Sequence, residues 1–291
     1  MLAGILMDRH SVNATTSLGI SVVSASNNRD VLERNLCRSP MIASGSVPLH
    51  IEWQAPSASI AYNRGWDATT SEYVVFAHQD VYFPLGWDVR LRSCIELLQR
   101  LDPNWALIGS FGVDARGIGF GPVWSTSIGC IVGRIATKPV VVQSFDELLM
   151  IGRRSAAIRF DEKAPNFHFY GLDAVQTAIV ANKNSYAMSL PVVHNDKFHG
   201  RLESDFTEAY RYMKSKWRQK LPLHTPITTV SQYGMHLYRD RLLNRKSFGF
   251  RQSTSGRTDI NPQVYATLCG WDDVSPRMAA LPDSPTNFTV K

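Results

Sequence analysis

Short apolar runs alternate with helical patterns over the first hundred or so residues of the chain. Each run is rich in Val, Ile, Leu, Phe or Tyr and ends in polar residues, which is typical of a buried strand. Between the runs, a polar residue opens a stretch with apolar positions at helical spacing. The strands are predicted at 18–24, 49–53, 73–77 and 106–109, and the helices at 31–38, from Ser57 and from Pro84. Because strand and helix alternate, the pattern predicts an α/β fold with a doubly wound, mostly parallel sheet and helices on both faces.

The pattern changes after about residue 112 and fades after residue 225. Glycines and short β-rich pieces fill 112–165, including 138–142 and 148–151. A helix at 172–182, a strand at 185–193 and a basic, aromatic helix at 203–220 follow. These changes predict an N-terminal extension (1–17), one α/β domain (18–222) and a C-terminal helical extension (223–291).

The composition is that of a globular protein, which excludes disordered and fibrous classes. The chain has 291 residues, of which 44% are hydrophobic and 19% charged. No run of eighteen apolar residues occurs, so no spanning helix is predicted. The apolar run at the start is short and lacks a preceding basic region, so no secretory signal is expected. Four cysteines stand far apart without a C-x-x-C pair, and we interpret them as reduced thiols of a cytoplasmic protein.

The net charge of +6 lies almost entirely in the last third of the chain. Residues 1–196 hold 16 basic and 17 acidic residues, whereas residues 197–291 hold 15 basic and 8 acidic residues. Such asymmetry indicates an anionic partner, for example nucleic acid, a membrane surface or a phosphorylated ligand. A solvated basic face explains it equally well.

Three polar sites follow predicted strands or begin a helix, and they carry the candidate chemistry. His78 and Asp80 follow the strand at 73–77, His194 follows the strand at 185–193, and Asp173 opens a helix. Ligands of parallel sheets bind at the carboxyl ends of the strands. Imidazole and carboxylate groups are competent ligands for Mn²⁺ or Mg²⁺ when phosphate oxygens complete the coordination. Taken singly, a histidine after a strand is usually structural and an aspartate at a helix start is usually a cap.

The ordered combination of these sites resembles the nucleotide-sugar-binding part of GT-A glycosyltransferases, in the family 2-like group that includes streptomycin-biosynthesis-type enzymes. The resemblance covers about 18–222, and its most specific part is 61–80. The His78-Gln79-Asp80 motif stands where most glycosyltransferases have D-x-D. The matching segments are Ala61–Gly65, Val75–Val81, Phe160–Glu162, His168–Asp173, Val193-His194 and Lys216-Trp217 with Leu221-Pro222.

The resemblance implies an inverting glycosyltransferase that uses a nucleotide-diphosphate sugar. Asp80, His78 and His194 would hold a divalent metal (Mn²⁺ or Mg²⁺), with His78 as a ligand or a donor contact, and Asp173 would be the catalytic base. The donor would be a UDP-, GDP- or dTDP-sugar, and the acceptor a glycan, a lipid-linked glycan or a small molecule. Further substrate-binding residues would be Ser26, Asn27, Arg29 and Glu52 at the base and ribose, Asn63 and Arg64 at the diphosphate, Asp146 and Glu147 near the sugar, and Trp124 at the acceptor.

Three other functions stay open at this point. A nucleotidyltransferase would carry a glycine-rich loop after the first strand, but Ser24–Arg29 contains no glycine. A nucleic-acid-binding or anionic-surface-binding protein would use the basic residues after His194, although no nucleic-acid-binding motif is visible. A catalytically silent sugar-nucleotide binder would keep the pocket without turnover. The basic region would also suit peripheral contact with a membrane surface.

Overall fold

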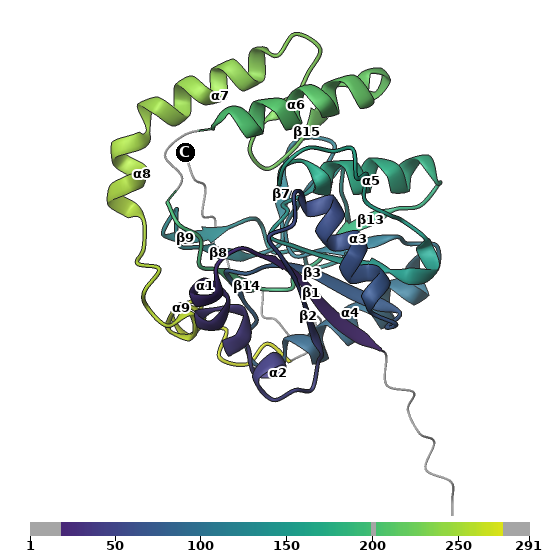
Figure 1. Cartoon of the computed structure of the whole chain (residues 1–291), viewed down its shortest axis with the longest axis vertical. Helices are drawn as coiled ribbons and strands as arrows, with labels where there is room; N and C mark the ends of the chain where they lie inside the picture. The colour runs from purple at the N-terminus through teal and green to yellow at the C-terminus, as the bar shows by residue number, and fades with distance from the viewer. Residues whose placement is uncertain (1–18, 199–201, 276–291) are drawn as a thin grey trace, which may run out of the picture.

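A mixed seven-stranded sheet forms the centre of the protein (Figure 1). The computed structural model describes residues 19–198 and 202–275. Five strands share one direction, and β10 and β12 run antiparallel to their neighbours. The α/β class with a mostly parallel sheet is therefore confirmed, with two reversed strands that the sequence pattern did not indicate. In order across the sheet, the strands are β10 (Val140–Val141), β13 (Ser185–Ala187), β5 (Leu107–Gly109), β12 (Leu149–Arg153), β3 (Tyr73–His78), β1 (Ile20–Ser26) and β2 (Leu49–Trp53).

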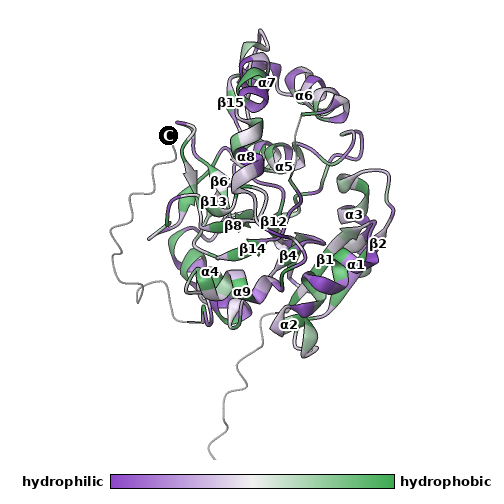
Figure 2. Ribbon diagram, turned by 90° about the vertical axis from the view of Figure 1, so that its left-hand side faces the viewer, coloured by the Kyte–Doolittle hydropathy of each residue, from purple (hydrophilic) through white to green (hydrophobic). Residues whose placement is uncertain are grey.

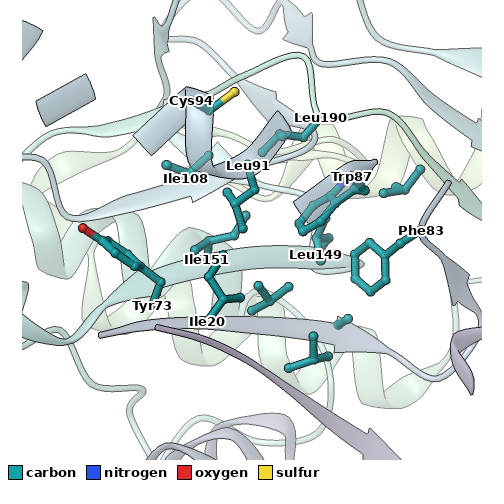
Figure 3. Close-up of a cluster of buried hydrophobic side chains, with 14 of the residues drawn as sticks. Ile20, Tyr73, Phe83, Trp87, Leu91, Cys94, Ile108, Leu149, Ile151 and Leu190 are labelled. Carbon is teal, nitrogen blue, oxygen red and sulfur yellow. The ribbon is translucent and has the colours of Figure 1, made fainter. Parts of the chain in front are cut away.

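Helices cover both faces of this sheet, as predicted. Alternate residues of the buried strands point to opposite faces, so Val22 and Val75 join one apolar cluster while Val23 and Phe76 join another. The first cluster packs under α4, and Figure 3 shows part of it; the second packs under α3 and α5. The helices of this region are α1 (Arg29–Arg34), η1 (Leu36–Arg38), α2 (Pro40–Ala43), α3 (Ala58–Ala68), α4 (Trp87–Leu101), η2 (Arg154–Ala156) and α5 (Tyr170–Val180).

Local signals set the starts of these helices. The side chain of Asn28 accepts a hydrogen bond from the Val31 amide and caps α1, and Ser57, at which the sequence pattern opens a helix, does the same for the Ile60 amide of α3. Helix α4 begins after Gly86, not at Pro84, because Gly86 at φ 76° takes a left-handed conformation that interrupts the helix there.

A second, four-stranded sheet lies at the carboxyl end of β3. Its order is β4 (Val81–Tyr82), β14 (Val192–His194), β8 (Val123–Ser125) and β9 (Cys130–Val132). The single strand predicted at 185–193 is wrong, because its first part pairs in the central sheet and its last part pairs in this one. Pro191 lies between the two strands, and a proline has no amide hydrogen for a sheet ladder.

Short strand pairs complete the middle of the chain. One sheet contains β11 (Ser144–Phe145), β6 (Gly112–Val113) and β7 (Gly119–Phe120), in that order. Another pairs β15 (Leu223–His224) with β16 (Thr229–Val230). The glycine-rich stretch therefore forms several two- and three-residue strands, as its pattern predicts.

Apart from the β15–β16 pair, the C-terminal region is helical where the structure describes it, and it returns to the second sheet. Its helices are α6 (Ser204–Lys216), η3 (Arg218–Lys220), α7 (Met235–Lys246), α8 (Phe248–Thr254) and α9 (Pro262–Leu268). After α8, the amide of Gly256 donates to the Thr126 carbonyl at 2.7 Å, and Tyr265 of α9 stacks on Trp124 at 5.0 Å. In the described parts of the chain, no helix is long and apolar enough to cross a bilayer.

Candidate functional site

The turn between β3 and β4 brings His78 and Asp80 next to His194. His78 ends β3, and Asp80 precedes β4, which pairs antiparallel with β14 so that Val81 lies opposite His194. The amide of Asn195 donates to the Asp80 carbonyl at 2.9 Å and fixes this register. The junction between the two sheets therefore assembles residues that are far apart in the sequence.

His78, Asp80 and His194 each offer one ligand atom, and these atoms all lie within 4.8 Å of one another. Asp80 Oδ1 lies 3.3 Å from His194 Nε2. The same oxygen is shielded from solvent, and no described residue hydrogen-bonds to it. Two imidazoles and a carboxylate with spare acceptor capacity fit a divalent cation, and such a set suits Mn²⁺ better than Mg²⁺, which prefers oxygen ligands.

The carboxylates around His194 favour a positive charge at this position. Burial by itself would lower the pKa of His194, but Asp196 and Asp80 outweigh it and raise the pKa to about 10. Burial opposes the ionisation of Asp80, yet the neighbouring His194 holds the pKa of that carboxyl well below its usual range. The site is therefore an anionic pocket that stabilises a cation.

His78 is neutral and held in one orientation. Burial lowers the pKa of His78 to about 4. The Tyr170 hydroxyl donates its hydrogen to the Glu147 carbonyl at 2.7 Å, so its oxygen must accept from His78 Nε2, which lies 2.8 Å away. The proton of the ring is therefore on Nε2, and Nδ1 keeps the lone pair that a metal requires.

Three more carboxylates belong to the surroundings of this group. Asp196 Oδ1 accepts hydrogen bonds from Ser125 Oγ at 3.1 Å and from the Ser127 amide at 3.0 Å, and it lies 4.0 Å from His194 Nδ1. Burial raises the pKa of Asp146, and burial together with Asp146 raises the pKa of Glu147 well above its usual range. The fields of His194 and Asp196 act on Asp146, so this predicted sugar-side residue lies in the same neighbourhood.

A cavity of about 260 Å³ adjoins Asp80 at the carboxyl end of β1. Gln79 holds the loop after β1 that lines this cavity, because Gln79 Oε1 accepts hydrogen bonds from Ser26 Oγ at 2.7 Å and from the amides of Asn27 and Asn28. Gln79 Nε2 returns a bond to Asn27 Oδ1 at 2.9 Å. Apart from Val31, the residues that line the cavity are polar or charged; the lining set is Asn27, Asn28, Val31, Arg34, Asn35, Gln79, Asp80, Asn195, Lys197 and Thr258.

Arg29, Glu52, Arg64 and Trp124, which the resemblance also assigns to substrate binding, are not among the residues that line this cavity. Arg29 is exposed and stacks over Trp53 at 5.7 Å, and Glu52 contacts His50 at 2.6 Å, both at the ends of β1 and β2. Trp124 lies beside β14 but stacks on Tyr265. Arg64 is exposed on α3.

Asn63 does not join the group. Its side-chain amide donates to the Phe160 carbonyl and to Glu162 Oε1, both at 2.9 Å, and accepts from the Phe160 amide at 3.1 Å. These bonds tie α3 to the 160–162 segment and leave the buried amide directed into the protein.

Asp173 lies in the first turn of α5 and is buried against α6. Lys216 Nζ lies 2.7 and 2.9 Å from its two oxygens, and Trp217 Nε1 donates to it at 2.9 Å. Lys216 also reaches Asp161 at 2.6 Å. Burial raises the pKa of Asp173 against the opposing pull of Lys216.

Several residues of the site had no role in the sequence-based hypothesis. Asn195 and Asp196 follow β14 directly, and polar residues just after a strand could have indicated that they belong to the site. Gln79 stands inside the quoted motif, but its role as the clamp of the β1–α1 loop depends on the fold. Lys197 follows shortly after β14, and Thr258 reaches the cavity through the C-terminal return, which no local pattern indicates.

The fold and site therefore define an α/β protein with a candidate cation group beside a polar cavity. No family model matches the sequence. A protein of Fuscovulum blasticum described as "ATP synthase subunits region ORF 6" is 29% identical over 150 residues, which are 48% of this chain and 59% of that protein. The chain thus matches less than two thirds of that relative.

Solved structures of glycosyltransferases are among the structural neighbours. A mannosyltransferase from Pyrobaculum calidifontis, in complex with GDP-Man and Mn²⁺, has a TM-score of 0.42 at 11% identity, covering 87% of this chain and 76% of its own. Glucosyl-3-phosphoglycerate synthase from Mycobacterium tuberculosis, with Mg²⁺ and UDP, has a TM-score of 0.40 at 11% identity, covering 69% and 79%. Likeness at this level assigns no activity to the chain.

Proposed function

We propose that this protein is a metal-dependent, inverting glycosyltransferase that takes its sugar from a nucleotide-diphosphate donor. The observation that carries the proposal is the group of His78, Asp80 and His194 beside a polar cavity at the carboxyl ends of β1 and β3. A nucleotide diphosphate needs a pocket for its base and ribose next to a cation for its phosphates. The sequence resemblance over 61–80 supports the same interpretation.

Different residues of the site would bind the nucleoside, the phosphates and the metal ion. Asn27 and the Gln79-clamped loop would bind the nucleoside part, while Lys197 and Arg34 line the cavity with positive charge suited to phosphate oxygens. Asp80, His194 and the Nδ1 atom of His78 would hold Mn²⁺. The bound ion would supply positive charge to the diphosphate leaving group.

The acceptor proton needs a carboxylate base, and two residues are in question. The resemblance points to Asp173, whose oxygens are bound by Lys216 and Trp217 and which could take a proton only after Lys216 releases it. Asp146 is half-buried within the field of His194. Asp173→Asn should abolish transfer with donor binding intact if Asp173 is the base; if Asp146 is the base, Asp146→Asn should do so instead.

A thermal-shift panel of UDP-, GDP- and dTDP-sugars, with and without Mn²⁺, tests the proposal. A ligand that binds only the native state raises the melting temperature. We expect one sugar nucleotide to stabilise the protein in a Mn²⁺-dependent manner, and Asp80→Asn to remove the Mn²⁺-dependent part. No stabilisation by any donor would contradict the proposal.

Two further measurements separate the alternatives. Slow release of free nucleotide from the stabilising donor indicates a transferase, whereas binding without release indicates a silent sugar-nucleotide binder. Tight, steeply salt-dependent binding to random DNA would instead favour nucleic acid as the partner.

A further inference from the structure

Helix α7 presents an apolar stripe to solvent. Met235, Tyr238 and Leu242 follow the i, i+3, i+7 spacing that puts residues on one helix face, and they are 72%, 69% and 42% exposed. Leu237, on the opposite face, is buried in the cluster that includes Tyr210 and Val230. The helix is therefore attached by one side and displays large apolar side chains on the other.

The inward contacts of α7 fix which face is free. Asp240 Oδ2 accepts a hydrogen bond from Thr228 Oγ1 at 2.7 Å, and Arg241 donates to Thr207 Oγ1 on α6. These residues lie on the same side as Leu237. The stripe of Met235, Tyr238 and Leu242 thus cannot turn inward without breaking this attachment.

Basic residues flank the stripe. Residues 233–254 contain five basic residues and one acidic residue. Arg245 and Lys246 are exposed, and their side chains make no ion pair or hydrogen bond with another described residue. The one acidic residue, Asp240, is already engaged by Thr228 and Arg239. The surface therefore combines apolar groups with uncompensated positive charge.

The next helix extends the same kind of surface. Ser247 joins α7 directly to α8, where Phe250 is 73% exposed. Figure 1 shows α7 and α8 at the periphery, away from the central sheet, and Figure 2 shows hydrophobic and hydrophilic residues interleaved along α7. Nothing else in the described structure covers this surface.

We propose that the α7–α8 surface docks the protein on an anionic membrane. Exposed aromatic and aliphatic side chains interspersed with basic residues favour the interface of an anionic membrane, where apolar groups lie about 5–10 Å into the headgroup region. Tyr238, Leu242 and Phe250 enter the acyl boundary, while Arg245 and Lys246 contact lipid phosphates. This inference is independent of the proposed enzyme activity.

The charge pattern favours a lipid surface over a second copy of this chain. A symmetric dimer through α7 would place the basic residues of both copies near each other, and Asp240 is the one acidic residue available there. Anionic headgroups supply many negative charges over the whole length of both helices. The basic C-terminal region thus faces outward at α7–α8, while Lys197 faces the cavity.

Co-sedimentation of the full chain with vesicles tests the proposal. Vesicles of phosphatidylcholine alone are compared with vesicles of equimolar phosphatidylcholine and phosphatidylglycerol. We expect binding to the anionic vesicles, weakened by salt. Arg245→Gln/Lys246→Gln should lower the partition coefficient about fivefold for each charge removed. Tyr238→Ser/Leu242→Ser should lower it by on the order of tenfold.

Matched variants elsewhere on the surface are the controls. Leu101→Ser/Val180→Ser removes two exposed apolar side chains at the ends of α4 and α5, and Arg38→Gln/Arg100→Gln removes two exposed charges. These variants should bind as the unaltered protein does, and circular dichroism should show that all four variants are folded.

Equal losses in control and test variants would overturn the proposal, because binding would then reflect net charge or hydrophobicity alone. Absence of binding to anionic vesicles would also overturn it. So would a dimer in light scattering that Tyr238→Ser/Leu242→Ser dissociates, since the surface would then bind a second copy.

Discussion

His78 on β3 and Tyr170 on α5 share a hydrogen bond of 2.8 Å between the Nε2 atom and the phenolic oxygen. Since the Tyr170 hydrogen is used by the Glu147 carbonyl, the bond fixes the Nε2–H tautomer of the histidine. The bond also links the proposed metal group to the helix whose first turn carries Asp173.

Tyr170→Phe should therefore weaken Mn²⁺ binding without unfolding the protein. The ring of His78 would lose the acceptor that sets its tautomer and orientation, and the loss of such a partner typically costs about 10–100-fold in metal affinity. Isothermal titration with Mn²⁺ measures the effect. Tyr186→Phe is the control, because the Tyr186 hydroxyl binds Asp102, outside the site. Equal Mn²⁺ affinity in both variants would show that Tyr170 does not position His78.

The strands of the central sheet could be predicted because each is marked by the pattern of apolar and polar residues within its own segment. The run at 73–77 is apolar, the run at 49–53 alternates apolar with polar residues, and both are followed by polar residues; they form β3 and β2 within one residue of the predicted bounds. The antiparallel direction of β12 could not be predicted, because a strand covered on both faces has the same apolar pattern in either direction.

The grouping of three site residues could be predicted, but their surroundings could not. His78, Asp80 and His194 lie at or just after the carboxyl ends of strands, and the structure brings them together, while their role as metal ligands stays a prediction. Asn63 lies in the most specific matching segment, yet its contacts with Phe160 and Glu162 depend on how the 160–162 segment folds back on α3. The division into 18–222 and 223–291 stays a prediction.

Glu147 should make stability depend on pH. Burial raises the pKa of this carboxyl well above its usual range, so the unfolded chain releases the proton first as the pH rises. The contribution of Glu147 to the free energy of unfolding is greatest below the pKa of the unfolded chain, about 4.3, and is lost as the pH rises through the folded pKa. The total loss is about 1.4 kcal/mol for each pH unit between the unfolded and the folded pKa.

Glu147→Gln should remove this loss. The melting temperature of the variant should be close to that of the unaltered protein at about pH 4 and higher at about pH 8. The amide oxygen can still accept the hydrogen bond of the Gly171 amide. Glu96→Gln, on the exposed side of α4, is the control. A variant that is less stable at the higher pH would contradict this account of Glu147.

Lys216 and Asp173 should be coupled in stability. Lys216→Met would leave the buried Asp173 carboxylate with Trp217 as its remaining donor, and breaking a buried ion pair costs about 3–5 kcal/mol. Because the Lys216 side chain is 26% exposed, we expect a smaller loss, about 2 kcal/mol. Urea unfolding of Lys216→Met, Asp173→Asn and the double variant measures the coupling. Additive losses would mean that the two side chains do not interact.

Gln79 should control the affinity of the cavity for the nucleotide. Its side chain holds Ser26, Asn27 and Asn28 through four hydrogen bonds, so Gln79→Ala would release the β1–α1 loop that lines the cavity. With about 1 kcal/mol for each bond and partial replacement by water, we expect the dissociation constant of the stabilising sugar nucleotide to rise about tenfold. Mn²⁺ affinity without nucleotide should change little, because Gln79 is not among the grouped ligands. Titration calorimetry with the nucleotide and with Mn²⁺ separates the two effects. Gln99→Ala is the control, because the Gln99 amide donates to the Tyr73 hydroxyl on the side of the sheet that α4 covers. An unchanged nucleotide affinity in Gln79→Ala would show that the clamped loop takes no part in binding.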